Sequence, residues 1–166
     1  MMLAQFTEPN LLVPRLLSES RDHAIAELSS RLKKAGRIEN DDAFTQAVLK
    51  HESFVSAVFD EVAFPLARGM AVKELSFAIG LTQPGICWGT GKAPTVHAVV
   101  LFAVPLSEEQ SYLSLVMTFS NFLKDGTAFS TLRRCTQPEK MFAKLETIPL
   151  SRLMAPPQPA KGGVKS

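Results

Sequence analysis

Between residues 20 and 51 hydrophobic positions recur every three or four residues, which is the spacing of one face of an α-helix. The apolar positions of the first such segment are Ala24, Ile25, Leu28, Leu32 and Ala35. Ser20 precedes this segment, and Gly36 follows it as a residue that commonly stops a helix. Asn40 offers a capping side chain for a second helix, which we expect to end at His51. The pattern therefore predicts a helical hairpin.

Beyond His51 the pattern changes to short runs rich in β-branched and aromatic residues. These runs predict strands over 62–67, 75–79 and 96–104, and a brief earlier one over 10–14. The run 96–104 is apolar on both alternating faces apart from His97, as expected of a central strand covered by helices on both sides. Glycines and prolines in 82–94 predict an irregular connection.

Three further helices are predicted in the C-terminal part of the chain. Ser107 begins a capping box before a long amphipathic segment that ends at Asp125 and Gly126. Thr127 is positioned to cap a shorter helix, and Thr136 begins a second capping box before a helix that reaches Leu145. The sequence thus predicts a single α/β domain over 1–154, followed by a flexible, Pro/Gly-rich tail over 155–166.

Composition narrows the function classes. The chain has 166 residues, 46% hydrophobic content and a formal net charge of +2, which is too small a surplus to indicate binding to nucleic acid or anionic lipid. The longest apolar stretch is far shorter than the ~20 residues that span a bilayer, so we expect a cytoplasmic protein. Cys87 and Cys135 lack the spacing of a zinc or redox motif, so we expect buried free thiols and neither a metal nor a cofactor.

The histidines and one glycine-rich stretch are the remaining candidates for chemistry. The stretch 89–95 superficially resembles a phosphate loop, but Ile86 and Ala93 stand where that motif needs a glycine and a hydroxyl, so a turn is expected. His97 is expected to be a hydrogen-bonded structural residue, and His51 to complement the end of its helix. The residues alone reveal no catalytic constellation.

Three stretches resemble a known family. Leu28 to Leu49 has the form of its paired N-terminal helices, Ala63 to Arg68 matches its signature V-A-I-P-H-A-R, and Pro94 to Leu123 matches its strand-and-helix pattern. The family is the enzyme IIA domain of the phosphoenolpyruvate-dependent sugar phosphotransferase system, in its fructose/mannitol and nitrogen-regulatory branch. The resemblance covers about residues 3–148, and it implies a mixed β-sheet flanked by helices on both faces, with the active site at the signature.

Members of this family carry a phosphoryl group on a histidine nitrogen and pass it to a sugar-specific acceptor domain. The aligned position here is Leu66, whose side chain has no lone pair and cannot form a phosphoryl adduct. The family's second histidine aligns with Tyr112. The resemblance therefore implies a phosphoryl carrier that has lost its acceptor.

The glycine-rich approach to the family's site is also altered. The pattern T-G-I-G-x-G-V-A becomes Ser56 to Ala63, so bulk and charge replace glycines. Asp60 and Glu61 are expected to face a bound phosphate at about 6 Å, at a cost of about 3 kcal/mol per pair of unit charges. Pro65 and Arg68 persist, and Arg68 is expected either to pair with one of those carboxylates or to remain an ordinary exposed arginine.

The leading hypothesis is a degenerate IIA-like domain that is not phosphorylated and acts as a regulatory module. It would bind a protein partner, namely a phosphotransferase-system carrier, a transporter or a sensor protein, or else a small molecule. Its binding residues would be Ser56, Asp60, Glu61, Pro65, Arg68 and Tyr112.

Two alternatives remain open. The first is an active phosphocarrier that uses a displaced histidine, His51 or His97. The second is an inert subunit of a larger assembly, in which Leu66, Phe59 and Phe64 form an apolar contact surface.

Overall fold

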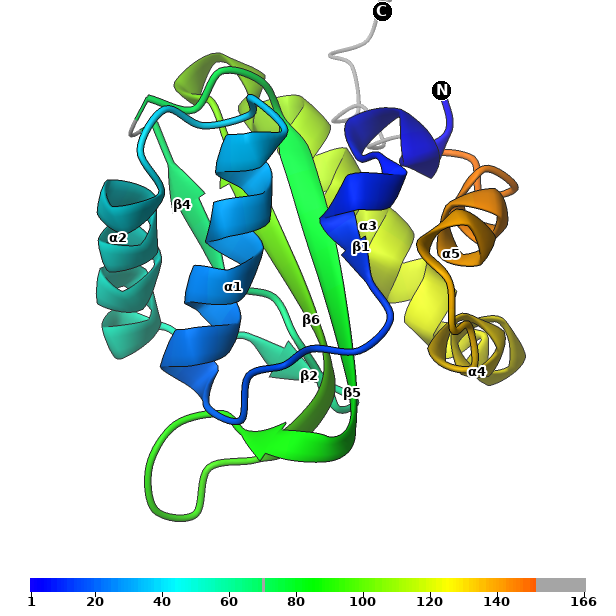
Figure 1. Cartoon of the computed structure of the whole chain (residues 1–166). Helices are drawn as coiled ribbons and strands as arrows, with labels where there is room; N and C mark the ends of the chain where they lie inside the picture. The colour runs from blue at the N-terminus through cyan, green and yellow to red at the C-terminus, as the bar shows by residue number, and fades with distance from the viewer. Residues whose placement is uncertain (70, 152–166) are drawn as a thin grey trace, which may run out of the picture.

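The computed structural model describes residues 1–69 and 71–151, which form a mixed β-sheet between two layers of helices (Figure 1). The strands are β1 (Leu12–Val13), β2 (Val58–Phe59), β3 (Val62–Ala63), β4 (Leu66–Arg68), β5 (Ser76–Cys87) and β6 (Thr95–Val104). Their order is β1-β5-β6-β3-β2, and β4 also pairs with β6. β5 and β6 are antiparallel, whereas β3 and β4 each run parallel to β6, so the sheet is mixed as predicted.

Helices cover both faces of the sheet. The hairpin of α1 (Arg21–Lys34) and α2 (Asp41–Phe54) lies on one face. On the other side are α3 (Glu109–Lys124), α4 (Gly126–Arg133) and α5 (Pro138–Leu145) (Figure 1). Three short 3₁₀ turns complete the fold: η1 (Leu3–Phe6), η2 (Pro9–Leu11) and η3 (Leu106–Glu108).

β6 is the central strand, and its side chains alternate between two hydrophobic cores. Phe102 and Val104 belong to the core that includes α3 and α5, whereas Leu101 and Ala103 belong to the core beneath α1 and α2. The two-sided apolar pattern of residues 96–104 therefore correctly predicted a strand buried on both faces.

The helix boundaries agree with the sequence where a side chain caps the backbone. The Ser20 hydroxyl accepts the His23 N–H at 3.2 Å, and the Asn40 side chain accepts the Ala43 N–H at 2.9 Å. The second helix continues past His51 to Phe54.

The capping boxes predicted at Ser107 and Thr136 are wrong. α3 is entered through the 3₁₀ turn η3, and Gln137, rather than Thr136, precedes α5 without a side-chain cap. For α4 the cap is Asp125, whose carboxylate accepts the Ala128 N–H at 3.1 Å, rather than Thr127. Ser107 lies inside η3 and so cannot be the extended residue that caps α3, and α5 begins one residue later than the motif at Thr136 requires.

The strands differ from the prediction at their ends. The run 62–67 is divided into β3 and β4 at Phe64 and Pro65, where proline has no N–H to donate. β5 reaches Cys87 by way of an irregularity between Leu81 and Ile86, so the connection is confined to 88–94.

β2 is a short strand that the sequence did not predict. It pairs with β3 across a turn at Asp60 and Glu61, whose φ angles are 53° and 68°. Two consecutive positive φ angles usually require glycine or asparagine, and neither stands here, which concealed the turn.

Two further expectations concern the cysteines and the tail. Cys87 is exposed at the end of β5 and Cys135 is half-buried, so the prediction of buried thiols is wrong. The strand alternation that buries Ile86 turns Cys87 outward. The tail predicted over 155–166 lies outside the described residues, as do the last three positions of the predicted domain.

Candidate functional site

The signature segment forms β4 and lies next to the C-terminal half of β6. Leu66 pairs with Phe102 and Arg68 with Val104. Leu66 is 6% exposed and Tyr112 is 7% exposed, and both belong to the core beneath α3. The Phe102 and Tyr112 rings meet edge to face with centroids 5.4 Å apart. The structure therefore brings Leu66, Arg68 and Tyr112 together, as the motif resemblance implied.

Arg68 is held by Glu109 at the start of α3. Its Nε donates to Glu109 Oε1 at 3.0 Å and its Nη2 to Oε2 at 3.2 Å, and its guanidinium carbon lies 5.3 Å from the centre of the Tyr112 ring. The expected pairing with Asp60 or Glu61 is therefore wrong. β4 carries Arg68 towards the end of the sheet where α3 begins, away from the β2–β3 turn.

The phenol of Tyr112 is protonated at neutral pH. Burial raises the pKa of Tyr112 above its ordinary 10.0, Arg68 acts to lower it, and Glu109 acts to raise it. Such a group can donate a hydrogen bond but cannot exchange protons near neutrality. It therefore does not replace a histidine in acid–base chemistry.

Asp60 and Glu61 lie away from Leu66. The Glu61 carbonyl accepts the His97 N–H at 2.8 Å, and Glu61 Oε1 lies 2.6 Å from His97 Nδ1. Leu66 pairs with Phe102 instead. Phe102 lies five residues beyond His97 on β6, which is about 17 Å at ~3.4 Å per residue. The expectation that these carboxylates face a phosphate at about 6 Å is therefore wrong, because the register of β3 against β6 separates them from the signature.

Ser56 belongs to a separate polar contact at the end of α2. Its hydroxyl donates to Glu52 Oε1 at 2.9 Å, and the Trp88 indole N–H donates to the same oxygen at 3.0 Å. The Ala57 carbonyl accepts the Phe64 N–H at 2.9 Å, which places this segment beside the chain just before buried Pro65. Glu52 is 5% exposed and was missed by sequence reasoning, since a carboxylate in the last helical turn carries no signal of burial.

The predicted apolar contact surface does not form. Leu66 is buried, Phe64 is half-buried against the core, and only Phe59 is largely exposed. Near Arg68 the exposed apolar side chains are instead Leu106, at 77%, and Leu113, at 41%. Sequence reasoning missed Leu106 because this residue lies in the unpredicted turn η3.

The two candidate histidines occupy different settings. His97 lies next to the Glu61 carboxylate on its Nδ1 side, and the His97 side chain is 22% exposed. His51 lies in the last turn of α2 and is half-buried. Neither histidine adjoins Leu66 in the sheet pairing, which runs from Leu66 to Phe102.

The sequence of the chain matches a known protein family. Residues 5–147 match the family described as "Phosphoenolpyruvate-dependent sugar phosphotransferase system, EIIA 2". The chain belongs to this family. Its members' domains have the mixed α/β fold seen here.

Two curated proteins are similar to this EIIA-type chain. It is 28% identical over 149 residues, 88% of its length, to the PTS system 2-O-alpha-mannosyl-D-glycerate-specific EIIABC component of Escherichia coli K12, of which it spans 23%. It is 25% identical over 107 residues, 64% of its length, to the PTS system fructose-specific EIIABC component of Bacillus subtilis 168, of which it spans 17%. The chain thus corresponds to less than a quarter of each of these proteins.

Solved structures of the family share the fold at low sequence identity. The nitrogen regulatory protein IIA-Ntr from Neisseria meningitidis superimposes with a TM-score of 0.76 at 15% identity, covering 86% of this chain and 97% of that one. IIA mannitol from Escherichia coli gives 0.69 at 18% identity, covering 82% and 96%. IIA mannitol in complex with phosphorylated IIB mannitol, also from Escherichia coli, gives 0.70 at 17%, covering 82% and 94%.

Two features bear on membrane association and metal binding. Within 1–69 and 71–151, no helix is long and apolar enough to cross a membrane. The same residues contain no group of three or more His, Cys, Asp or Glu side chains placed to hold a metal ion.

Proposed function

We propose that this EIIA-type domain is not phosphorylated and acts by binding a protein partner at the altered signature. The observation that carries the proposal is the position of Leu66. It aligns with the acceptor histidine of the motif V-A-I-P-H-A-R and is 6% exposed within the core beneath α3. A hydrocarbon side chain in that place offers no nucleophile for phosphoryl transfer.

The surroundings of Leu66 support the same proposal. An incoming phosphate needs cationic groups that are free to bind it. The guanidinium of Arg68 already makes two hydrogen bonds to the Glu109 carboxylate and lies over the Tyr112 ring. A phosphoryl group would have to displace Glu109 and would still find no acceptor.

The same corner presents a surface suited to a protein. Leu106 follows β6 in η3, and a Cβ on Gly69 would lie only 3.4 Å from its Cγ, so Leu106 covers the chain just after Arg68. Leu113 lies one helical turn beyond Glu109 on α3, on the same face. Two exposed leucines beside an ion pair combine the apolar and the polar groups that protein contacts use. A partner from the phosphotransferase system, a transporter or a sensor protein would dock there.

A labelling experiment tests the absence of phosphorylation. The chain is incubated with enzyme I, the phosphocarrier protein and labelled phosphoenolpyruvate, with IIA mannitol from Escherichia coli as the positive control. We expect acid-labile label on the control and none on this chain. Acid-labile label on any histidine of this chain would contradict the proposal.

A capture experiment tests the surface. Immobilised chain is compared with Leu106→Ser/Leu113→Ser and with a matched variant, Phe59→Ser, which removes an exposed apolar side chain from β2. We expect the double variant to lose a partner that the original chain and the Phe59 variant both retain from host extract. Equal retention by all three would show that the partner binds elsewhere.

Phosphoryl transfer through a displaced histidine is the second candidate, and one observation favours His97 over His51. A carboxylate close to Nδ1 favours a proton on that nitrogen and leaves Nε2 as the nucleophile, and Glu61 Oε1 lies 2.6 Å from His97 Nδ1. If label does appear, His97→Ala should abolish it and His51→Ala should not. The opposite result would assign the reaction to His51.

A further inference from the structure

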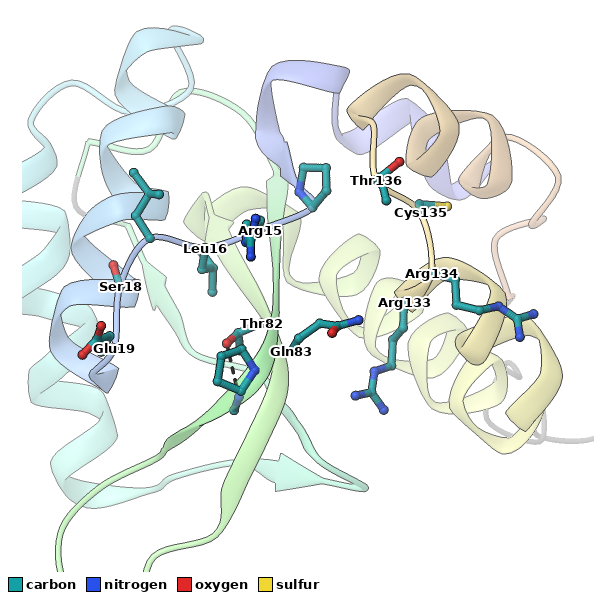
Figure 2. Close-up of a pocket in the computed structure, with 14 residues that line it drawn as sticks. Arg15, Leu16, Ser18, Glu19, Thr82, Gln83, Arg133, Arg134, Cys135 and Thr136 are labelled. Atoms are coloured by element: carbon teal, nitrogen blue, oxygen red, sulfur yellow. Dashed lines mark hydrogen bonds between the residues drawn. The ribbon is translucent and has the colours of Figure 1, made fainter.

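A cavity of about 380 Å³ lies at the other end of the sheet (Figure 2). Its walls come from three segments distant in sequence: residues 14–19, the irregular part of β5 at 82–85, and the α4–α5 connection at 133–136. Pro84 and Gly85 interrupt the pairing of β5 with β6, and Gly85 has a φ of 88°. Leu81 is level with Ala98, whereas Arg68 is level with Val104, so about 20 Å of strand separates this cavity from the signature.

Three arginines and one glutamate are among the residues that line the cavity, and Figure 2 shows the Arg134 side chain extending outward from it. Arg15, Arg133 and Arg134 contribute the positive charges, and Glu19 contributes the negative one. Within residues 1–69 and 71–151 none of these arginines forms an ion pair, whereas Arg68 pairs with Glu109. The Arg133 guanidinium instead lies 5.8 Å from the centre of the Phe129 ring. The lining therefore carries an uncompensated positive charge.

The side chains are arranged for a polar ligand. Figure 2 shows Gln83 reaching from β5 towards Arg133 on α4. A second hollow of about 170 Å³ shares Thr82, Gln83 and Arg133, and is also lined by His97. Leu16 and the two prolines at 14 and 84 supply apolar walls. Charged donors beside apolar walls are typical of a site for a small charged organic molecule.

We propose that this cavity binds a small organic phosphate ester. Arginine presents a rigid fork of N–H donors that matches the oxygens of a phosphate. A phosphate monoester carries about two negative charges near neutral pH, and the lining arginines outnumber the one lining carboxylate, that of Glu19. The volume lies in the lower part of the range for ligand pockets, so the organic part is small. The proposal does not depend on the function proposed for the signature.

Binding has a structural consequence. A ligand in the cavity joins the segment that enters α1, the interruption of β5 and the end of α4. It stabilises the folded chain, since it binds an arrangement that the unfolded chain lacks. It also covers Cys135, which lines the cavity and is half-buried.

Calorimetric titration with glucose 6-phosphate tests the proposal, with glucose as the uncharged probe of similar size and citrate as a carboxylate probe. The variants are Arg15→Gln/Arg133→Gln and a matched loss of two positive charges, Lys50→Gln/Lys140→Gln, at exposed positions outside the cavity. Alkylation of Cys135 in a Cys87→Ser background gives a second, independent readout.

We expect saturable binding of glucose 6-phosphate, slower alkylation of Cys135 in its presence, and no binding of glucose. The arginine variant should bind about tenfold more weakly or worse, because it loses two charge-assisted donors, while the lysine variant should bind as the original chain does. Absence of saturable binding would overturn the proposal. So would equal weakening in both variants, or binding of citrate without binding of glucose 6-phosphate.

Discussion

The two ends of the central strand hold arginines in opposite situations. At the C-terminal end of β6, Arg68 is fixed by Glu109 and lies over Tyr112. At the other end, Arg15 and Arg133 line a cavity and form no ion pair within 1–69 and 71–151. The difference teaches that a motif arginine does not by itself mark an anion site. What decides is whether the fold places a carboxylate against it or leaves space beside it.

The packing of the two ends differs for a related reason. Around Leu66 the aromatic rings of Phe102, Tyr112 and Phe119 pack edge to face and leave Leu66 inside the core. Around the cavity, Pro84 and Gly85 break the strand pairing. The signature end is thus closed by packing, and the opposite end is held open by backbone irregularity.

The largest expected effect is a loss of stability when the packing at the signature end is disrupted. Leu66→Ala removes a buried side chain from the core and should lower the free energy of unfolding by about 2–4 kcal/mol. Gln83→Ala, at an exposed position of β5, is the matched control and should change it by less than about 0.5 kcal/mol. Urea unfolding of both variants measures the difference. Equal small effects would mean that Leu66 is not packed as described.

A smaller effect is expected when a wall of the cavity at the opposite end is displaced. A Cβ at Gly80 would lie 2.5–2.8 Å from three side-chain carbons of Leu16, which lines the cavity. Gly80→Ala should therefore displace Leu16, lower the free energy of unfolding by about 1–3 kcal/mol and weaken binding of glucose 6-phosphate. Gly126→Ala meets nothing within 4 Å and serves as the control. If Leu16 is displaced and glucose 6-phosphate still binds with the same affinity, Leu16 does not contribute to the site.

The smallest effect concerns Tyr112, the only tyrosine of the chain, which makes its absorbance specific. Since burial raises the pKa of Tyr112 above 10.0, the stability it contributes is fully present below pH 10 and is lost as pH rises through the folded-state pKa. Spectrophotometric titration should show a pKa above 10.0. The Glu109→Gln variant should lower that pKa and change stability by less than about 1 kcal/mol, because the pair with Arg68 is half-exposed. A rise in the pKa of the variant would contradict the arrangement around Arg68.

Local pattern predicted much of the fold because the physics involved is local. The spacing of Ala24, Ile25 and Leu28 predicted α1, and the capping side chain of Asn40 predicted the start of α2. The two-sided apolar run of β6 predicted a central strand. Pairing over long distances was not visible: the continuation of β5 beyond Leu81 depends on its contact with β6 rather than on its own residues.

The candidate site was predicted in part for the same reason. Leu66 and Tyr112, which the motif assigns to one site, share one core, and Arg68 lies over the Tyr112 ring. The prediction that Arg68 pairs with Asp60 or Glu61 was wrong. Its partner, Glu109, is 41 residues away in the sequence and reaches Arg68 only because α3 begins next to the end of β4. The cavity that Arg15 and Arg133 line could not be predicted from the sequence, because three segments distant in sequence form it.

By itself the sequence determined that residue 66 is a leucine, and with it that this side chain carries no nucleophile, since no fold can give a hydrocarbon a lone pair. Tertiary structure alone decided which charges compensate one another. Ion pairing depends on distances of a few ångströms between residues far apart in the chain, and only the packing of helices on the sheet sets those distances.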